Sequence, residues 1–559
     1  MNQPQQAFEK FAPAKSSSVG SWERWTREHT DVMALAVIAF GCLLRIREAW
    51  GTFLNPDEAV HFFIADRSSL DAVYNASLTQ AHPPLLFFVL YALRPFGNSE
   101  LVLRLPSILA GTVFCWVLFR WLVRTLGPAV ALVGVIFAAL LPTMISVTAQ
   151  ARQYGLLLLF LISGACFLES ALTDDSPALM LASAISLWLA MLSHYSAFLF
   201  IAALGVYALL RFKGSEFSAR TIIAWTVNQI LTLTLAIFLY LTHISKIRGT
   251  AMAEQAFDIW LRRSYFHRGQ ENPLTFLVTR SFSVFQYIAG QLVIGDILAV
   301  LFLLGVALLL RGKVQSLGVR RLPFGSFLIV PFILNFTAAL VDVYPFGGTR
   351  HCVYLSIVAI AGIAACVVTV TRQSALRAVA IALSIFALCF ALHSTQHPFI
   401  ARADQQRSHV YQAADFIREQ IPVADPILVD YESGIELGHY GCEQRTTTYD
   451  ASIPGFLVFH CSGHRFISTV PEVWAFTPAS FQKEWTVLIA RGYLKPGDTV
   501  CVAQAGWVVN LDEGLREKFP GLAGLKTQMF GNNIRFFRLQ VGDHSASAKP
   551  SDLVIPQLP

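Results

Sequence analysis

The chain has 559 residues, of which 55% are hydrophobic and only 14% are charged, and its formal net charge is +6. Soluble globular proteins usually carry about 25% charged residues, so this composition excludes a disordered chain and indicates a protein that lies mostly in a membrane. Residues 1–393 hold 28 Lys and Arg against 19 Asp and Glu, whereas residues 394–559 hold 14 against 17. The basic excess therefore belongs to the membrane part, where it reports orientation rather than nucleic-acid binding.

Apolar runs of about the ~20 residues that a helix needs to cross a bilayer recur up to residue 393. The first 30 residues are polar and hold no apolar run typical of a signal peptide, so we expect a cytoplasmic N-terminal segment at 1–30. We predict eleven membrane spans, at 31–49, 101–124, 128–148, 155–172, 177–193, 196–211, 221–243, 294–310, 323–342, 352–371 and 375–393.

One further apolar run, Pro83–Leu93, has 11 residues, and runs of this length are more often interfacial than spanning. If it does not cross, the short loops on one side carry 15 Lys and Arg and those on the other side carry 7. Basic loops stay in the cytoplasm, so we predict outer loops at 50–100 and 244–293. The transmembrane domain, 31–393, then ends on the outer side.

Residues 394–559 regain charge, Gly and Pro. Helical spacing over 404–420 puts Val410, Ala413, Ala414 and Ile417 on one face, and short strands are indicated at 426–431, 498–502 and 534–541. We predict an exoplasmic α/β domain at 394–545 and a flexible tail at 546–559. Disulfides form on an oxidising side, and Cys442 and Cys461 are our candidates for one, with Cys501 as a free thiol.

The first outer loop contains Asn55-Pro-Asp-Glu-Ala-Val-His61. An Asn cap, a Pro at the first position and acids in the first turn are typical of an ordinary helix start. The pattern also fits a catalytic carboxylate pair, because Asp57 or Glu58 at the membrane surface could take a proton from an incoming hydroxyl. His61 lies four residues after Asp57 and shares its helix face. The residues alone leave both interpretations open.

Other polar residues are predicted at the same membrane face. Charges at membrane depth suggest function, although an arginine can also snorkel to the interface and a lone histidine or a tight turn can be structural. A carboxylate with converging arginines suits transfer from a phosphate leaving group, whose charge the arginines take up. The residues are Arg45, His82, Arg104, Arg152, Tyr154, His194, Tyr195, Arg350 and His351.

The chain resembles the polytopic glycosyltransferases of the GT-C fold, specifically the dolichyl-phosphate-mannose protein mannosyltransferases and the lipid A aminoarabinose transferases. The resemblance covers about residues 31–393 and rests on motifs in a fixed order: Leu43-Leu-Arg45, Pro56-Asp-Glu58, His82-Pro-Pro84, Arg104-Leu-Pro-Ser107, Gln150-Ala-Arg152-Gln-Tyr154 and the Arg350-His351 turn. It implies that Asp57 is the catalytic base, with Glu58 beside it, and that outer-face arginines contact a polyprenyl phosphate. The mannosyltransferases carry an Asp shortly after the Gln-x-Arg motif, where this chain has Gly155-Leu-Leu-Leu, so the sugar and the acceptor do not carry over.

From these observations we predict an α-helical polytopic membrane protein with about 11 transmembrane helices and a small C-terminal α/β domain, located in a bacterial inner membrane. It would be a cell-envelope glycosyltransferase that moves a monosaccharide from a polyprenyl-phosphate donor to a hydroxyl of a lipid, glycan or protein acceptor. Alternatives are a membrane transporter or lipid flippase, and a non-enzymatic assembly or sensor protein. We predict no cofactor and no nucleic-acid partner, and leave a divalent-metal requirement open.

The predicted site residues fall into three groups. The catalytic pair is Asp57 and Glu58, and the donor phosphate is bound by Arg152, Arg350, Arg45 and Arg104. The remaining substrate contacts are assigned to His61, His82, Tyr154, His194, Tyr195 and His351.

Overall fold

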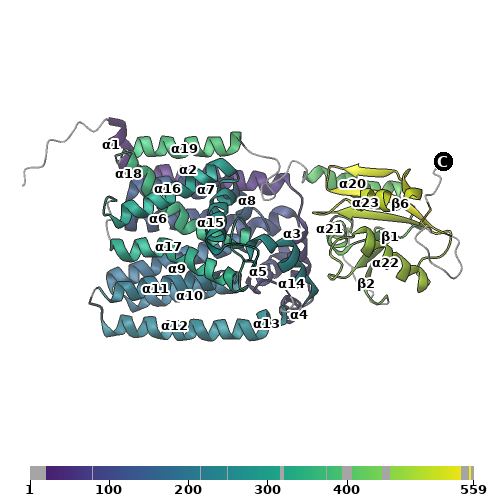
Figure 1. The fold of residues 1–559 in the computed structure, drawn as a ribbon, viewed down its shortest axis with the longest axis horizontal. Helices are drawn as coiled ribbons and strands as arrows, with labels where there is room; N and C mark the ends of the chain where they lie inside the picture. Colours follow the sequence, from purple (N-terminus) through teal and green to yellow (C-terminus); the bar gives the residue numbers. More distant parts are fainter. Residues whose placement is uncertain are drawn as a thin grey trace, which may run out of the picture.

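The computed structural model describes residues 21–78, 80–214, 216–247, 250–314, 320–372, 374–392, 406–442, 453–542 and 553–554. A bundle of long helices forms one part of the molecule and an α/β domain packs on one end of it (Figure 1). That end of the bundle is called the domain end below.

Each of the eleven predicted spans is helical. After α1 (Ser21–Glu28), the bundle contains α2 (Thr30–Gly51), α6 (Glu100–Leu126), α7 (Pro128–Leu140), α8 (Pro142–Thr148), α9 (Tyr154–Asp174), α10 (Pro177–Ser193), α11 (Ala197–Phe212), α12 (Ala219–Leu239), α16 (Leu292–Leu310), α17 (Arg321–Leu340), α18 (Ser356–Val370) and α19 (Ala375–Ala391). Among the described residues, six helices are long and apolar enough to cross a membrane, or seven if the bent pair α7 and α8 is one span. The chain is thus a multi-pass membrane protein, and the number of eleven crossings stays a prediction.

The span predicted at 128–148 is broken into α7 and α8, whose axes differ by 59°. Leu141 is extended (φ −61°, ψ 137°), as expected for a residue that precedes a proline, here Pro142. The break redirects the chain so that α8 leads into the turn that carries Arg152.

Short helices gather at the domain end (Figure 1). They are α3 (Pro56–Ala65), α4 (Leu70–Ser77), α5 (Leu85–Leu93), the 3₁₀ turn η1 (Arg94–Phe96), α13 (Ser245–Ile247) and α14 (Ala251–Gln255). The run Pro83–Leu93 forms the nine-residue α5. A helix of that length extends roughly 14 Å, about half of a bilayer core, so it fits the predicted non-spanning segment.

Residues 244–293, where the sequence predicted a loop, contain a full helix, α15 (Pro273–Ala289), packed along α16. Asn272 caps it and Pro273 occupies its first turn, and Phe276, Phe285 and Ile288 are buried. Arg280 interrupts its apolar sequence, which is why the run did not stand out as a span.

The C-terminal domain is a mixed sheet with helices on both faces. The strand order is β2-β3-β1-β4-β6-β5, with β7 added on β6; β1 is parallel to β3 and β4, and the other pairs are antiparallel. The strands are β1 (Ile427–Val429), β2 (Phe456–Cys461), β3 (His464–Thr469), β4 (Thr499–Ala505), β5 (Thr527–Phe530), β6 (Ile534–Val541) and β7 (Leu553–Val554). The helices are α20 (Arg407–Gln420), α21 (Tyr431–Gly441), α22 (Pro478–Ala490) and α23 (Leu511–Lys518).

Alternation along the strands builds two cores. Leu428, Ile467 and Val502 pack with α22 and α23 on one face, whereas their neighbours on the strands pack with α20 and α21 on the other. The four residues predicted on the inner face of α20 are buried, and the three predicted strands are present. The hairpin β2–β3 was not predicted; its turn uses left-handed Ser462 and Gly463.

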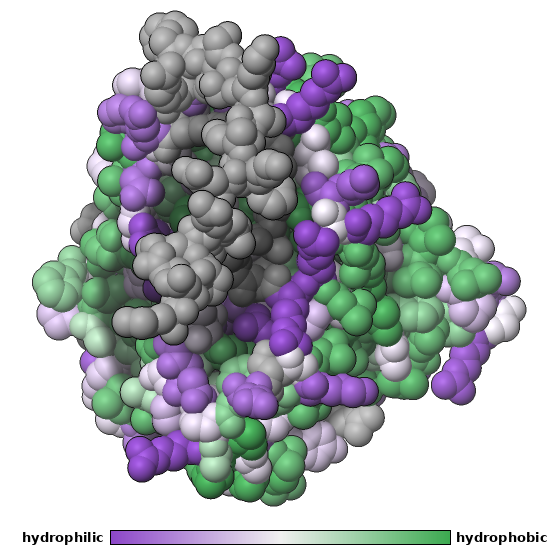
Figure 2. Space-filling model, turned by 90° about the vertical axis from the view of Figure 1, so that its left-hand side faces the viewer, coloured by the Kyte–Doolittle hydropathy of each residue, from purple (hydrophilic) through white to green (hydrophobic). Residues whose placement is uncertain are grey.

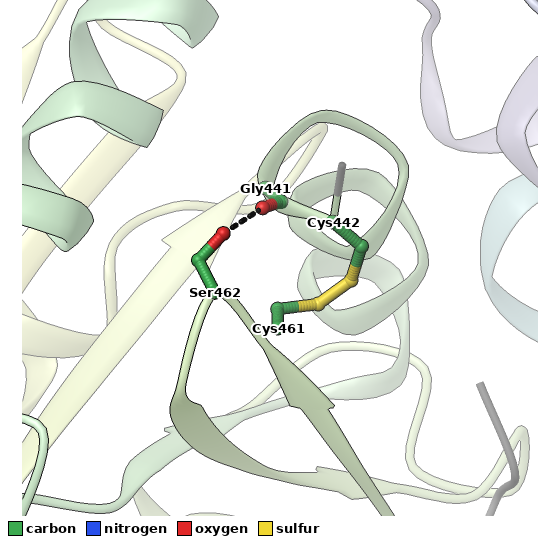
Figure 3. Close-up of a disulfide and its surroundings, with 4 residues drawn as sticks. All are labelled: Gly441, Cys442, Cys461 and Ser462. Carbon is green, nitrogen blue, oxygen red and sulfur yellow. Dashed lines mark hydrogen bonds between the residues drawn. A yellow bond between two sulfur atoms is a disulfide. The ribbon is translucent and has the colours of Figure 1, made fainter. Parts of the chain in front are cut away.

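A disulfide joins Cys442, at the end of α21, to Cys461, at the end of β2 (Figure 3). Ser462 Oγ also donates to the Gly441 carbonyl at 2.9 Å. The predicted bridge is confirmed, and Cys501 is buried and free in β4, as expected. The predicted tail, 546–559, is described only at Leu553–Val554, which pair with β6, and the rest lies outside the described residues.

The end of the bundle opposite the C-terminal domain is viewed in Figure 2. Hydrophilic side chains lie at several places on this end, interspersed with hydrophobic ones.

Candidate active site

The turn that begins α3 is a complete helix cap. Asn55 Oδ1 accepts from the Glu58 N–H at 3.1 Å, and Glu58 Oε2 accepts from the Asn55 N–H at 3.0 Å, with Pro56 in the first helical position. This capping box accounts for Asn55, Pro56 and Glu58 by helix stability alone. It does not use the Asp57 carboxylate.

Glu58 is buried and engaged by the protein on both oxygens. Arg104 donates to it from Nε and Nη2, each at 2.7 Å, and the Ala151 N–H donates to Oε1 at 2.6 Å. The other Arg104 donors reach the carbonyls of Ala49, Thr52 and Phe53 at 2.7–2.9 Å. With every donor of Arg104 occupied, Glu58 and Arg104 together fix the start of α3, and the catalytic and phosphate-binding roles assigned to them from the sequence stay predictions.

Arg45 is also turned to a structural task. Pro142 has no N–H, so the Ala138 carbonyl loses its helical partner at the α7–α8 break. Arg45 Nη2 donates to that carbonyl at 3.2 Å, Nη1 to the Ala139 carbonyl at 3.0 Å and Nε to Thr148 Oγ1 at 2.7 Å. Arg45 as a whole is 1% exposed and is held within the bundle by these bonds, and its contact with a donor phosphate stays a prediction.

Asp57 is held by two arginines from distant segments. Arg152 Nη1 lies 2.8 Å from Asp57 Oδ2, and Arg350 Nη2 pairs with the same oxygen. The Arg152 side chain is 2% exposed, whereas the Asp57 and Arg350 side chains are 22% and 23% exposed. Solvent therefore reaches the Asp57–Arg350 pair, while Arg152 is buried. Burial by itself would raise the pKa of the Asp57 carboxyl, but Arg152 and Arg350 outweigh it and lower that pKa well below its usual range.

Packing fixes the turn that carries Arg152. Ser107 Oγ on α6 donates to the Arg152 carbonyl at 2.6 Å. A Cβ at Gly155 would lie 2.6 Å from the Ser107 carbonyl oxygen, so α9 can approach α6 this closely only with glycine there. The mannosyltransferases that this chain resembles have an Asp near this position. In this chain the position is a close contact between α9 and α6.

Four histidines form a row beside the ion pairs. The ring centroids of His61 and His82 are 5.4 Å apart, those of His82 and His194 5.7 Å, and those of His194 and His351 6.0 Å. Gln153 bridges His61 and His82 with contacts of 3.2 and 2.9 Å. Burial and the nearby Arg152 lower the pKa of His61 to about 3 and that of His82 well below its usual value. Both imidazoles are therefore neutral and suited to hydrogen bonding rather than to charge pairing.

Several buried polar atoms around this row have no hydrogen-bond partner among the described residues. They are Arg152 Nε, Tyr154 Oη, Tyr195 Oη and His351 Nδ1. The Tyr154 ring packs 5.3 Å from His194 and lies 5.7 Å from the Arg152 guanidinium, whereas Tyr195 packs on Phe198. Buried polar groups are nearly always paired, so the unpaired atoms of Arg152, Tyr154 and His351 beside the partly exposed ion pairs indicate a candidate ligand site.

The structure thus brings together eight of the predicted site residues: Asp57, His61, His82, Arg152, Tyr154, His194, Arg350 and His351. It adds Gln153, which lies inside the Gln150–Tyr154 motif, and Tyr344, whose ring is 6.5 Å from His194. Within the part of the chain that the structure describes, no group of three or more His, Cys, Asp and Glu side chains is arranged to hold a metal ion.

A protein-family model and several solved structures match this chain. The family model of the dolichyl-phosphate-mannose-protein mannosyltransferases matches residues 81–245. The apo structure of ArnT from Cupriavidus metallidurans is 14% identical, with 90% of this chain and 97% of that chain covered and a TM-score of 0.53. The archaeal oligosaccharyltransferase AglB from Archaeoglobus fulgidus is 12% identical, with 85% and 70% covered and a TM-score of 0.49. No curated protein sequence matches significantly.

These comparisons confirm the resemblance to the GT-C glycosyltransferases. The identity to ArnT is low, so what the two chains share is the fold. The matched range, 81–245, contains His82, Arg104 and Arg152 but not Asp57 or Arg350.

Proposed function

We propose that this protein is a membrane glycosyltransferase that moves a monosaccharide from a polyprenyl-phosphate donor to a hydroxyl of a lipid, glycan or protein acceptor. The observation that carries the proposal is the solvent-reached Asp57 carboxylate paired with Arg152 and Arg350. The GT-C fold and the match to the dolichyl-phosphate-mannose-protein mannosyltransferases support it.

The proposed reaction uses these groups in two tasks. Asp57 takes the proton of the acceptor hydroxyl, whose oxygen forms the new bond to the anomeric carbon. The bond between that carbon and the phosphate oxygen breaks, and its electron pair stays on the phosphate. Arg152 and Arg350 take up the charge that develops on the phosphate, with Arg152 already desolvated by burial.

The two tasks are coupled because the same arginines serve both. Without a donor they neutralise Asp57 and lower its pKa, which makes it a weak base. A bound phosphate competes for the guanidiniums, and as they turn to it the pKa of Asp57 rises toward its usual range. Base strength would therefore follow donor binding. The neutral His61 and His82 then offer hydrogen bonds to sugar hydroxyls.

The site would face the exoplasmic side of a bacterial inner membrane. The excess of basic residues in the loops at the other side supports this orientation. The disulfide Cys442–Cys461 supports it independently, because disulfides persist in oxidising compartments.

The test is transfer of label from a panel of polyprenyl-phosphate sugars by the purified protein in detergent. Asp57→Asn keeps the shape of the side chain but cannot accept the proton, and we expect a rate loss of about 10²–10⁴. Asp71→Asn is the matched control, since Asp71 is an exposed carboxylate of α4 that accepts from Asn75. Turnover by the Asp57→Asn protein equal to that of the control would contradict the assignment of the base.

A further inference from the structure

The C-terminal domain packs directly on the helix that carries Asp57. α21 lies against α3, with the His439 ring 4.9 Å from Phe62 and the Phe63 ring 3.9 Å from where a Cβ of Gly438 would be. The Tyr440 side chain joins the apolar cluster of Leu54, Phe62 and Leu103. The domain thus shares a core with the outer segment 52–65.

Tyr440 also binds the backbone of that segment. Its hydroxyl accepts from the Leu54 N–H at 2.7 Å and donates to Glu100 Oε1, at the start of α6, at 3.2 Å. Leu54 is fully buried and precedes the cap residue Asn55. The hydroxyl therefore holds the chain three residues before Asp57.

The same stretch is also held by the membrane bundle. Arg104 on α6 binds the carbonyls of Ala49, Thr52 and Phe53. Arg407, at the start of α20, pairs with Glu100 at 3.2 Å, and Gln406 forms a β-bridge with Thr52. The chain from 49 to 58 is thus held by one clamp from the bundle and one from the C-terminal domain.

α21 is itself anchored at the end that carries Tyr440. Two residues later, Cys442 is bonded to Cys461 of β2 (Figure 3). Burial, with Glu432 and Glu58 nearby, raises the pKa of the fully buried Glu436, one turn before Tyr440, well above its usual value. The disulfide next to the end of the helix gives Tyr440 a defined position.

We propose that the C-terminal domain is part of the active site and that Tyr440 is a positioning residue for Asp57, acting through the Leu54 N–H. This inference rests on the proposed function, in which Asp57 is the base. Proton transfer demands precise placement of the base, and a shift of about 1 Å can cost 10²-fold in rate. Arg152 and Arg350 come from other segments, so the donor phosphate is held independently of Tyr440.

The test compares Tyr440→Phe with Tyr411→Phe in the full-length protein. Tyr411 is the matched control, because its ring lies 5.7 Å from Tyr440 and its hydroxyl binds Arg407. Removing the Tyr440 hydroxyl should speed hydrogen exchange of the Leu54 amide about 3- to 10-fold, which is the usual effect of one lost neutral hydrogen bond. We expect kcat to fall by a similar factor while the donor KM changes less than about twofold.

The outcomes separate cleanly. Faster Leu54 exchange with lower kcat in the Tyr440→Phe protein alone supports the inference. Unchanged Leu54 exchange overturns the clamp, and faster exchange with unchanged kcat overturns the positioning role. If even wild-type protein transfers no sugar, the proposed function fails and the catalytic part of this inference fails with it, whereas the exchange measurement still reports on the clamp.

Discussion

Replacing Glu58 by Gln should destabilise the fold around the candidate site without changing Asp57, the proposed base. The two carboxylate oxygens accept from Arg104 Nε, Arg104 Nη2, Asn55 N–H and Ala151 N–H. Each oxygen receives two of these four donors, so the amide nitrogen of Gln would face two donors in either orientation. At least two hydrogen bonds are lost and the buried Arg104 charge loses its counter-ion.

Breaking a buried ion pair from one side costs about 3–5 kcal/mol of the free energy of unfolding. We therefore expect Glu58→Gln to lose stability by about that amount, and to lose activity with it. Size-exclusion recovery after heating in detergent measures the stability. Asp57→Asn should lose more activity and less stability than Glu58→Gln, because Asp57 and Arg350 are partly exposed, at 22% and 23%. The exposed Asp71→Asn is the control for both.

The double variant Glu58→Gln, Arg104→Met sharpens the test. It removes the orphaned charge, so it should recover part of the stability, although the carbonyls of Ala49, Thr52 and Phe53 still lose their donor. A Glu58→Gln protein as stable as wild type but inactive would refute this reasoning and would favour a catalytic role for Glu58.

Three further predictions concern the ion pairs and the disulfide. Arg152→Lys and Arg350→Lys keep the charge but lose the planar fork, so donor KM should rise while the fold persists; an unchanged donor KM in both would make these residues ordinary anchors. Arg350→Gln removes one of the cations that lower the pKa of Asp57, so that pKa rises and the acidic limb of the pH–rate profile should move to higher pH; an unmoved limb would separate that limb from Asp57. Cys442→Ser with Cys461→Ser opens a 19-residue separation and should destabilise the C-terminal domain by about 3 kcal/mol, as read by thermal unfolding against Cys501→Ser; equal unfolding temperatures would contradict a stabilising bridge.

Local patterns predicted much of the architecture. Apolar runs marked the helices of the bundle, the spacing of Val410, Ala413 and Ile417 marked the buried face of α20, and Asn55-Pro56 marked the start of α3. These features depend on residues within one or two turns of each other. The hairpin β2–β3 and the helix α15 were missed, because a Ser-Gly turn and an arginine within an apolar helix are weak local signals.

The roles of the four arginines show what the sequence by itself determined and what it left to the tertiary structure. Composition and order placed Arg45, Arg104, Arg152 and Arg350 near one membrane face, and nothing local distinguished them. Packing put Arg45 against carbonyls exposed by a helix break and Arg104 against Glu58, and left Arg152 and Arg350 to meet Asp57. An ion pair forms only when atoms approach within about 4 Å, and for residues that lie from 46 to nearly 300 positions apart only the packing of the whole bundle sets that distance.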